Sequence, residues 1–401
     1  MTSRRNFLTL LGAGAAATLL GCDDGAPRPV ADPGATPDVL LVDTVAGLVI
    51  LRGGSADAWG PAVATPDGHT IFAARTAGTD TELRTLSARS GEVARSVRLP
   101  GRWFPSAAGP SGLVALVAPA SGPDAYPPAG RDHTSLLIVS GDAVRRLDLA
   151  GNYVPDAFTP DGRGLFVLDW LPSTAPEHYR VREVNVVSGA VSALYGRDKQ
   201  PIPPEAEEQM RGVRRNAVFG AGGDVLYTLY THQPATAGWS GTDNAFIHTL
   251  QLDQHWAYCV DLPSPFGLDA NASHALAIDP SGSRLFVVDA AAGKLAVVDT
   301  DSLSVQRTVD VPRGGGPAYL AYAGEALHLA VDTSVVTIAG RDPTGRPVWN
   351  LPARALGLAS NVDGTRMYVG LPDAVEWYGA AGGQRLGRVP VTGLTGLRQA
   401  V

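Results

Sequence analysis

Lysine and cysteine are scarce in this sequence. Of its 401 residues two are cysteine, and only Lys199 and Lys294 are lysine, so arginine carries almost all of the positive charge. The chain has 32 basic against 39 acidic side chains and a formal net charge of −7. It contains no basic run with interleaved aromatic residues. An acidic, lysine-poor surface argues against nucleic acid, or an anionic lipid surface, as the main partner.

Catalytic and cofactor motifs are also absent. The eight histidines include no pair at metal-ligand spacing within a helix, and no HExxH, CxxC or CxxCH motif occurs. Residues 238–241 read GWSG, which lacks the last glycine of a nucleophile elbow. The Asp-Gly turns offer single carboxylates, too few for Ca²⁺, which takes many oxygen ligands. The sequence therefore predicts no metal, no cofactor and no catalytic residue, which favours a protein that is not an enzyme.

Apolar residues and turn formers are plentiful. The chain is 45% hydrophobic and 18% charged, which allows a substantial core and excludes a disordered protein. Its 47 glycines and 31 prolines indicate many turns, and these favour a chain of short strands over long helices.

The N-terminus resembles an export signal. Residues 3–8 read SRRNFL, and an apolar stretch follows as far as Leu20, which is the form of a secretory leader. This stretch is shorter than the ~20 residues that cross a bilayer as a helix. Arg4 and Arg5, followed by Phe-Leu, resemble the twin-arginine consensus of folded, exported proteins. A Sec leader that happens to hold two arginines is the alternative. Residues 1–21 are the expected signal peptide.

Residues 19–22 read LLGC and resemble the bacterial lipobox. The resemblance implies that Cys22 carries acyl chains that hold the protein on the outer side of the cytoplasmic membrane. Residues 22–38, rich in Pro, Ala, Gly and Asp, are expected to form a flexible tether. Cys259 then has no disulfide partner, and its strand-like surroundings predict a packed core thiol rather than a nucleophile.

From residue 39 onward one pattern recurs: an apolar run, a small turn, another apolar run and two more strand-like segments. In the clearest copy the first turn reads DPSG at 279–282. Proline presets φ for such a turn and glycine tolerates positive φ, so the chain reverses cleanly. β-Branched and aromatic residues in the flanking runs suit a pleated surface. Each copy is therefore predicted to be a small antiparallel sheet of four strands.

Successive turn glycines are about 40 to 60 residues apart, which fits four-stranded propeller blades with insertions. They are Gly68, Gly112, Gly162, Gly223, Gly282, Gly324 and Gly364. A single sheet of this size cannot bury both of its faces, so the blades must pack into a ring. We predict an all-β fold, a β-propeller of seven four-stranded blades, or eight, over residues 39–401. Residues 39–51 are expected to close the ring by pairing with the last blade or with residues 394–397, since an open ring leaves an exposed edge.

The copies resemble the YVTN-type β-propeller repeat of bacterial surface and periplasmic proteins. The resemblance rests on the Pro-Asp-Gly turns, on LFVVD at 285–289 and on LAVVDT at 295–300. It covers nearly all of residues 39–395. It implies an architecture and says little about chemistry.

Three neighbouring units carry long insertions between their second and third strands, at 118–133, 169–180 and 230–244. In a propeller these connections emerge on the same face as the links between blades, here beside the long link 197–215. Long loops in compact domains are often functional, and Trp, Tyr and Arg dominate binding hot spots. The alternative is that the loops pack on one another as a lid and bind nothing. The residues expected to form a recognition surface are Arg131, His133, Trp170, His178, Tyr179, His232 and Trp239.

Together these features predict a membrane-anchored, extracytoplasmic lipoprotein. Its monomeric propeller is expected to bind a protein or small-molecule ligand through the loop-rich face. The alternative is a propeller enzyme, lactonase-like, hydrolase-like or quinone-dependent dehydrogenase-like, with its site at the mouth of the central channel. The residues that precede inner strands, and are therefore expected at that mouth, are Asp156, Arg211, Asn216 and His274.

Overall fold

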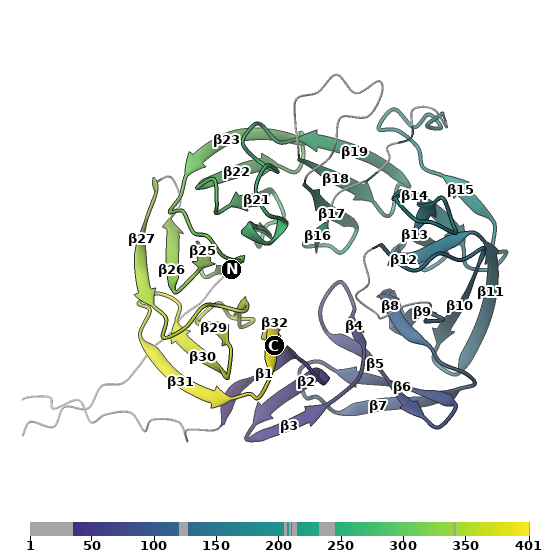
Figure 1. The fold of residues 1–401 in the computed structure, drawn as a ribbon, viewed down its shortest axis with the longest axis horizontal. Helices are drawn as coiled ribbons and strands as arrows, with labels where there is room; N and C mark the ends of the chain where they lie inside the picture. Colours follow the sequence, from purple (N-terminus) through teal and green to yellow (C-terminus); the bar gives the residue numbers. More distant parts are fainter. Residues whose placement is uncertain are drawn as a thin grey trace, which may run out of the picture. The chain divides into compact units, whose positions relative to one another are not determined.

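The computed structural model describes residues 35–119, 127–203, 207, 210, 215–231, 245–339 and 342–400. In this part of the chain the strands form eight four-stranded sheets in which sequential strands are antiparallel neighbours. The sheets are arranged as blades around a central axis (Figure 1). The predicted all-β propeller is confirmed.

The first four blades follow one another along the chain, each beginning with its innermost strand. Blade 1 contains β4 (Ala62–Ala64), β5 (Thr70–Ala77), β6 (Asp80–Ser87) and β7 (Val93–Leu99). Blade 2 contains β8 (Phe104–Ala108), β9 (Leu113–Val117), β10 (His133–Ser140) and β11 (Ala143–Ala150). Blade 3 contains β12 (Asn152–Phe158), β13 (Gly164–Leu171), β14 (His178–Asn185) and β15 (Val191–Ala193). Blade 4 contains β16 (Arg215–Phe219), β17 (Val225–Tyr230), β18 (Phe246–Gln251) and β19 (Trp256–Asp261).

The remaining blades complete the ring. Short 3₁₀ turns lie between β8 and β9, at Pro110–Gly112, and between β19 and β20, at Asn271–Ser273. Blade 5 contains β20 (His274–Ile278), β21 (Arg284–Asp289), β22 (Lys294–Asp299) and β23 (Ser304–Asp310). Blade 6 contains β24 (Ala318–Ala323), β25 (Ala326–Val331), β26 (Ser334–Ala339) and β27 (Asp342–Asn350). Blade 7 contains β28 (Leu358–Ser360), β29 (Arg366–Leu371), β30 (Ala374–Gly379) and β31 (Arg385–Pro390). Blade 8 contains β32 (Leu394–Ala400), β1 (Thr36–Thr44), β2 (Gly47–Gly53) and β3 (Ser55–Ala58).

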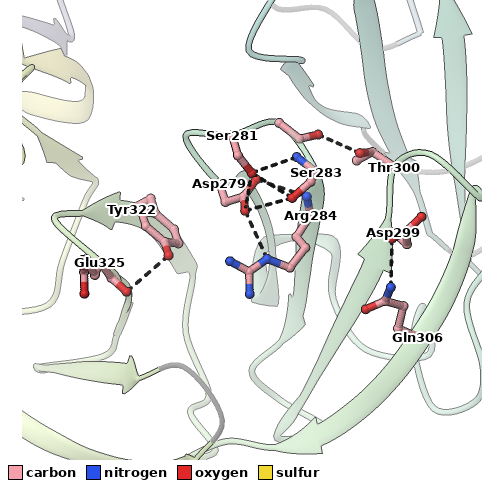
Figure 2. Close-up of polar contacts among 10 residues, drawn as sticks. Asp279, Ser281, Ser283, Arg284, Asp299, Thr300, Gln306, Tyr322 and Glu325 are labelled. Carbon is pink, nitrogen blue, oxygen red and sulfur yellow. Dashed lines mark hydrogen bonds and ion pairs between the residues drawn. The ribbon is translucent and has the colours of Figure 1, made fainter.

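The turn between the first and second strands has the geometry that the sequence predicts. All seven turn glycines have positive φ, from 59° at Gly324 to 79° at Gly112. In blade 5 the Asp279 carboxylate accepts hydrogen bonds from the backbone N–H of Arg284 at 3.1 Å and from the Ser281 hydroxyl at 3.0 Å (Figure 2). The aspartate therefore satisfies turn donors that have no strand partner.

Blade 8 corrects the count of seven to eight. Its innermost strand, β32, lies at the C-terminus, whereas β1, β2 and β3 come from the N-terminus. Because its first and second strands lie at opposite ends of the chain, this blade needs no turn between them and has no turn glycine. Counting turn glycines therefore misses it. β1 begins at Thr36, so residues 36–38 belong to the propeller and not to the tether.

The expected pairing of the chain ends is confirmed. β1 pairs with β32 antiparallel, from Leu40 opposite Ala400 to Thr44 opposite Leu394. A second contact joins blades 8 and 7, where the Asp38 carboxylate accepts a hydrogen bond from the Tyr368 hydroxyl at 2.6 Å. The ring is thus closed by main-chain pairing, which removes the open sheet edge.

Successive connections within a blade lie on opposite faces of the ring, because the strands are antiparallel. We call the face that carries the connections between second and third strands, and the links between blades, the loop face. The apolar core lies between neighbouring blades, as where Leu229 and Ile247 of blade 4 pack with Leu285 of blade 5. No helix in the described part of the chain is long and apolar enough to span a membrane.

Blade 6 contains a histidine whose protonation should make stability depend on pH. His328 on β25 is 1% exposed. Its Nδ1 lies 3.1 Å from the Thr337 hydroxyl, and its Nε2 has no hydrogen-bond partner among the described residues. Burial lowers the pKa of His328 from 6.5 to about 4, because the charged imidazolium loses its hydration.

The unfolding free energy should therefore fall as the pH drops from 6.5 to about 4. In this window the unfolded chain binds a proton at His328 and the folded chain does not, so acid favours unfolding. The unfolding free energy that depends on His328 is fully present above pH 6.5, and its loss in acid amounts to about 3 kcal/mol. Urea unfolding at several pH values should show this slope in the wild type and a shallower one in His328→Gln. The exposed His69→Gln variant is the control, and an equal slope in all three proteins would contradict the assignment.

Candidate functional site

Two of the three predicted recognition loops pack against each other in their described parts. The loops that follow β9 and β13 belong to neighbouring blades 2 and 3, and the Arg131 backbone N–H donates to the Ser173 carbonyl at 2.9 Å. A Cβ at Gly130 would collide with the Thr174 backbone. This close contact is the arrangement that the lid alternative predicts for these two loops.

Arg131 fastens the loops to the propeller. Its Nε donates to the Asn152 side-chain oxygen at 2.9 Å, and its Nη2 donates to the Tyr153 carbonyl at 2.7 Å. The Asn152 amide in turn donates to the Ser173 carbonyl at 3.0 Å. Burial lowers the pKa of Arg131. Its hydrogen bonds are thus made within the fold, in a structural role.

Two of the predicted recognition residues lie in the core, which corrects their placement in an exposed loop. Trp170 is the seventh residue of β13 and Tyr179 the second of β14, and they are 3% and 0% exposed. Their ring centroids are 4.7 Å apart, and the Tyr179 hydroxyl donates to the Tyr230 hydroxyl at 2.7 Å. Strand pairing continues to both residues, so the apolar rings fill the interface of blades 3 and 4. Alanine at Trp170 would cost about 3 to 5 kcal/mol of stability and would not test binding cleanly.

The other predicted loop residues are dispersed. His133 is exposed at the start of β10, and His178 is partly buried at the start of β14. His232 and Trp239 lie outside the described residues, as do Arg4, Arg5, Cys22 and Arg211.

A pocket of about 390 Å³ lies between blades 3 and 4. Its walls come from the third strands β14 and β18 and from the fourth strand β19. It is covered by described residues of the link between the blades, which are Leu194, Gly196, Arg197, Asp198, Ile202, Glu207 and Met210. The link is held at both ends. Tyr195 pairs with the start of β19, and Met210 pairs with Tyr179 of β14. We call this cavity the blade 3–4 pocket.

The apolar part of the pocket is formed by aliphatic side chains and one thioether, which are those of Val181, Leu194, Ile202, Ala257 and Met210. Its size lies within the ~300–1,000 Å³ that is usual for small-molecule sites. Cys259 also lines the pocket and is half-buried. The expectation of a thiol packed in the core therefore holds only in part.

Four charged side chains form an ion-pair network at one wall. Arg180 lies 2.9 Å from the Asp169 carboxylate and 2.7 Å from that of Glu207. Arg182 also pairs with Glu207, through two hydrogen bonds. Burial by itself would lower the pKa of Arg180, but Asp169 and Glu207 more than offset this and raise it. The two cations and two anions thus neutralise one another.

A separate cation lies at the pocket rim. The Arg197 guanidinium is 5.4 Å from the centre of the Tyr258 ring, and both residues line the pocket. Asp198 is next to it, but its Oδ1 accepts the backbone N–H of Gln200 at 3.1 Å and so caps its own turn. Among the described residues Arg197 contacts no carboxylate.

The central channel holds a second cavity, of about 540 Å³, formed by the starts of β16, β20, β24 and β28. Asn216 and His274 line it. The Asn216 amide donates to the His274 carbonyl at 3.1 Å. Asp156 lies elsewhere, half-buried on β12, and is not among the lining residues.

His274 is turned away from solvent. Its side chain is completely buried, with Nε2 3.0 Å from the Asp289 carboxylate. Burial by itself would raise the pKa of Asp289, but the interaction with His274 and the hydrogen bonds from the Ala292 N–H and the Ser273 hydroxyl outweigh it and lower the pKa. The His274 ring and the Asn216 amide nitrogen are thus used inside the fold. No cluster of three or more metal-ligating side chains occurs among the described residues.

Sequence reasoning missed most of the pocket. His248, Tyr258 and Cys259 lie in ordinary strands, and nothing in their local pattern marks them. The unusual length of the link from Arg197 onward was the available signal, since that link covers the pocket.

No protein-family model matches the chain, and no curated protein matches its sequence. Among solved structures it is similar to the dihydro-heme d1 dehydrogenase NirN in complex with DHE, with 13% identity and a TM-score of 0.54 over 93% of this chain and 77% of that one. It is similar to BamB from Moraxella catarrhalis, with 14% identity and a TM-score of 0.51 over 84% and 92%. It is also similar to the Dos1 propeller, with 9% identity and a TM-score of 0.51 over 82% and 80%. At these identities the likeness shows the β-propeller fold alone.

Proposed function

We propose that this chain is an extracytoplasmic lipoprotein, held at a membrane through Cys22, whose monomeric propeller acts as a ligand-binding module. The leader with Arg4 and Arg5 and the LLGC motif support export and lipidation. The YVTN-type repeat supports an extracytoplasmic site of action.

The blade 3–4 pocket is the observation that carries the binding proposal. This blade interface leaves about 390 Å³ beneath the link, whereas the cavity between blades 5 and 6 measures only about 30 Å³. The pocket combines an apolar interior with a few charged groups at its edge, which is the usual composition of a small-molecule site. We therefore place binding in this pocket and not on the predicted recognition loops, because Trp170 and Tyr179 are buried.

Lipidation is tested by replacing the proposed acylated residue. The Cys22→Ser variant should carry no acyl chains and should no longer be found in the membrane fraction, because the lipid supplies the anchor. Mass spectrometry of the N-terminal peptide, after cell fractionation, measures both effects. Cys259→Ser is the matched control and should be acylated like the wild type. Acylation of the Cys22→Ser protein would refute the anchor.

Binding is tested by filling the pocket. A panel of small compounds with apolar bodies and acidic, basic or neutral head groups is screened by thermal unfolding. At a hundred times its Kd, a bound compound should raise Tm by about 3 °C for a chain of this length. The rise should disappear in Ala257→Leu, which occupies the pocket, and persist in Ala143→Leu on the exposed fourth strand of blade 2. Equal rises in both variants, or none with any compound, would overturn the proposal.

A further inference from the structure

We infer that the blade 3–4 pocket takes a small amphipathic anion, with an apolar body inside the pocket and an acidic group at Arg197. This inference rests on the proposed binding function and adds the class of ligand. The position of Arg197 at the pocket rim, over the Tyr258 ring and without a carboxylate contact among the described residues, carries it.

The interior selects for an apolar body. Val181, Leu194, Ile202 and Ala257 present only hydrocarbon side chains to the pocket, and Met210 adds a thioether. Among these side chains a polar body would lose its hydration without gaining hydrogen bonds, which is unfavourable. An aliphatic or aromatic group is instead stabilised by removal of its surface from water.

Three of the charged lining residues, Arg180, Glu207 and Asp198, already have hydrogen-bond or ion-pair partners within the protein. Arg180 and Glu207 belong to the neutral network with Asp169 and Arg182. The Asp198 carboxylate accepts the Gln200 N–H within its own turn. A ligand charge would have to compete with these internal partners.

Arg197 is the charge that remains for a ligand. Its side chain is exposed, and it lies over the Tyr258 ring at the pocket rim. The ring limits the positions that the guanidinium adopts through a cation–π contact. A guanidinium held in this way can donate two parallel hydrogen bonds to a carboxylate or a similar acid.

The charge of the residues next to Arg197 also favours an anionic ligand. Lys199 lies two residues further along, with its Nζ 5.7 Å from the centre of the Trp256 ring. Arg197 and Lys199 together outweigh Asp198, so this stretch of the link is positive although the whole chain is acidic. An anionic ligand is attracted there, and a cationic ligand of the same shape is repelled.

The test compares three probes that share one body: 4-phenylbutyrate, 4-phenylbutanol and 4-phenylbutylamine. Calorimetry is performed on the full lipidated protein in nanodiscs, with the heats of empty nanodiscs subtracted. The butyrate should bind with one-to-one stoichiometry and about tenfold more tightly than the alcohol, with the amine weakest.

Two variants locate the effect. Arg197→Gln should reduce butyrate affinity to that of the alcohol and leave alcohol binding unchanged. Arg89→Gln, at an exposed arginine of blade 1, should change neither. The alcohol or amine binding as tightly as the butyrate, with loss in Ala257→Leu, would overturn the anion assignment and leave the binding function standing. No binding of any of the three probes would also overturn it.

Discussion

Removing β32 by truncation after Val391 is expected to abolish cooperative folding of the propeller. Leu394, Leu397 and Ala400 are buried in blade 8, and the truncation leaves the apolar residues of β1 and its main-chain edge exposed. Deleting one buried leucine side chain costs about 2 to 5 kcal/mol. The loss of the whole strand therefore approaches the ~5–15 kcal/mol that stabilises a typical protein.

Urea unfolding followed by circular dichroism measures this effect. The full chain should unfold in one steep transition, whereas the truncated chain should show a shallow one or none. Thr395→Ala, an exposed substitution on β32, should stay within about 0.5 kcal/mol of the wild type. An unchanged transition after truncation would mean that seven blades hold together without the eighth.

Glu207→Gln is expected to destabilise the protein by about 3 kcal/mol. Glu207 is the shared partner of Arg180 and Arg182, and the side chains of Glu207 and Arg182 are 9% and 12% exposed. Without its charge, two largely buried guanidinium groups face Asp169 alone. A buried cation without a counter-charge is costly because it has lost its hydration.

A second substitution separates the charge from the shape. Arg182→Leu, added to Glu207→Gln, removes the surplus cation and should recover at least half of the lost unfolding free energy. Asp142→Asn, in an exposed pair with Arg95, serves as the control and should cost less than about 1 kcal/mol. If Glu207→Gln costs no more than Asp142→Asn, the network contributes nothing beyond a surface ion pair.

The repeat could be predicted because its information is local. A turn needs residues such as Asp279 and Gly282 at fixed offsets, and strands show in short runs of β-branched residues. The eighth blade was harder to predict, because its four strands come from both ends of the chain. The need to cover the edge of β1 predicted its pairing with β32, but only the structure shows a complete blade.

The recognition residues could not be placed in this way. Trp170 and Tyr179 flank a Pro-containing segment and resemble loop residues, yet strand pairing extends to both and buries them. The sequence pattern cannot show where pairing between β13 and β14 ends, because long-range packing decides it. Arg131 is likewise of a residue type common in binding hot spots, but its guanidinium donates hydrogen bonds to Asn152 and Tyr153 within the fold.

The sequence by itself determined the export and lipidation motifs, the repeating four-stranded unit and the ring that such units must form. Each follows from residues close together in the chain. Tertiary structure alone decided which polar groups have hydrogen-bond or ion-pair partners inside the fold and which face a cavity. The blade 3–4 pocket joins β14, β18, β19 and the link between the blades. Its volume and its uncompensated Arg197 exist only when two neighbouring blades are packed side by side, because the pocket is the space that their side chains leave unfilled.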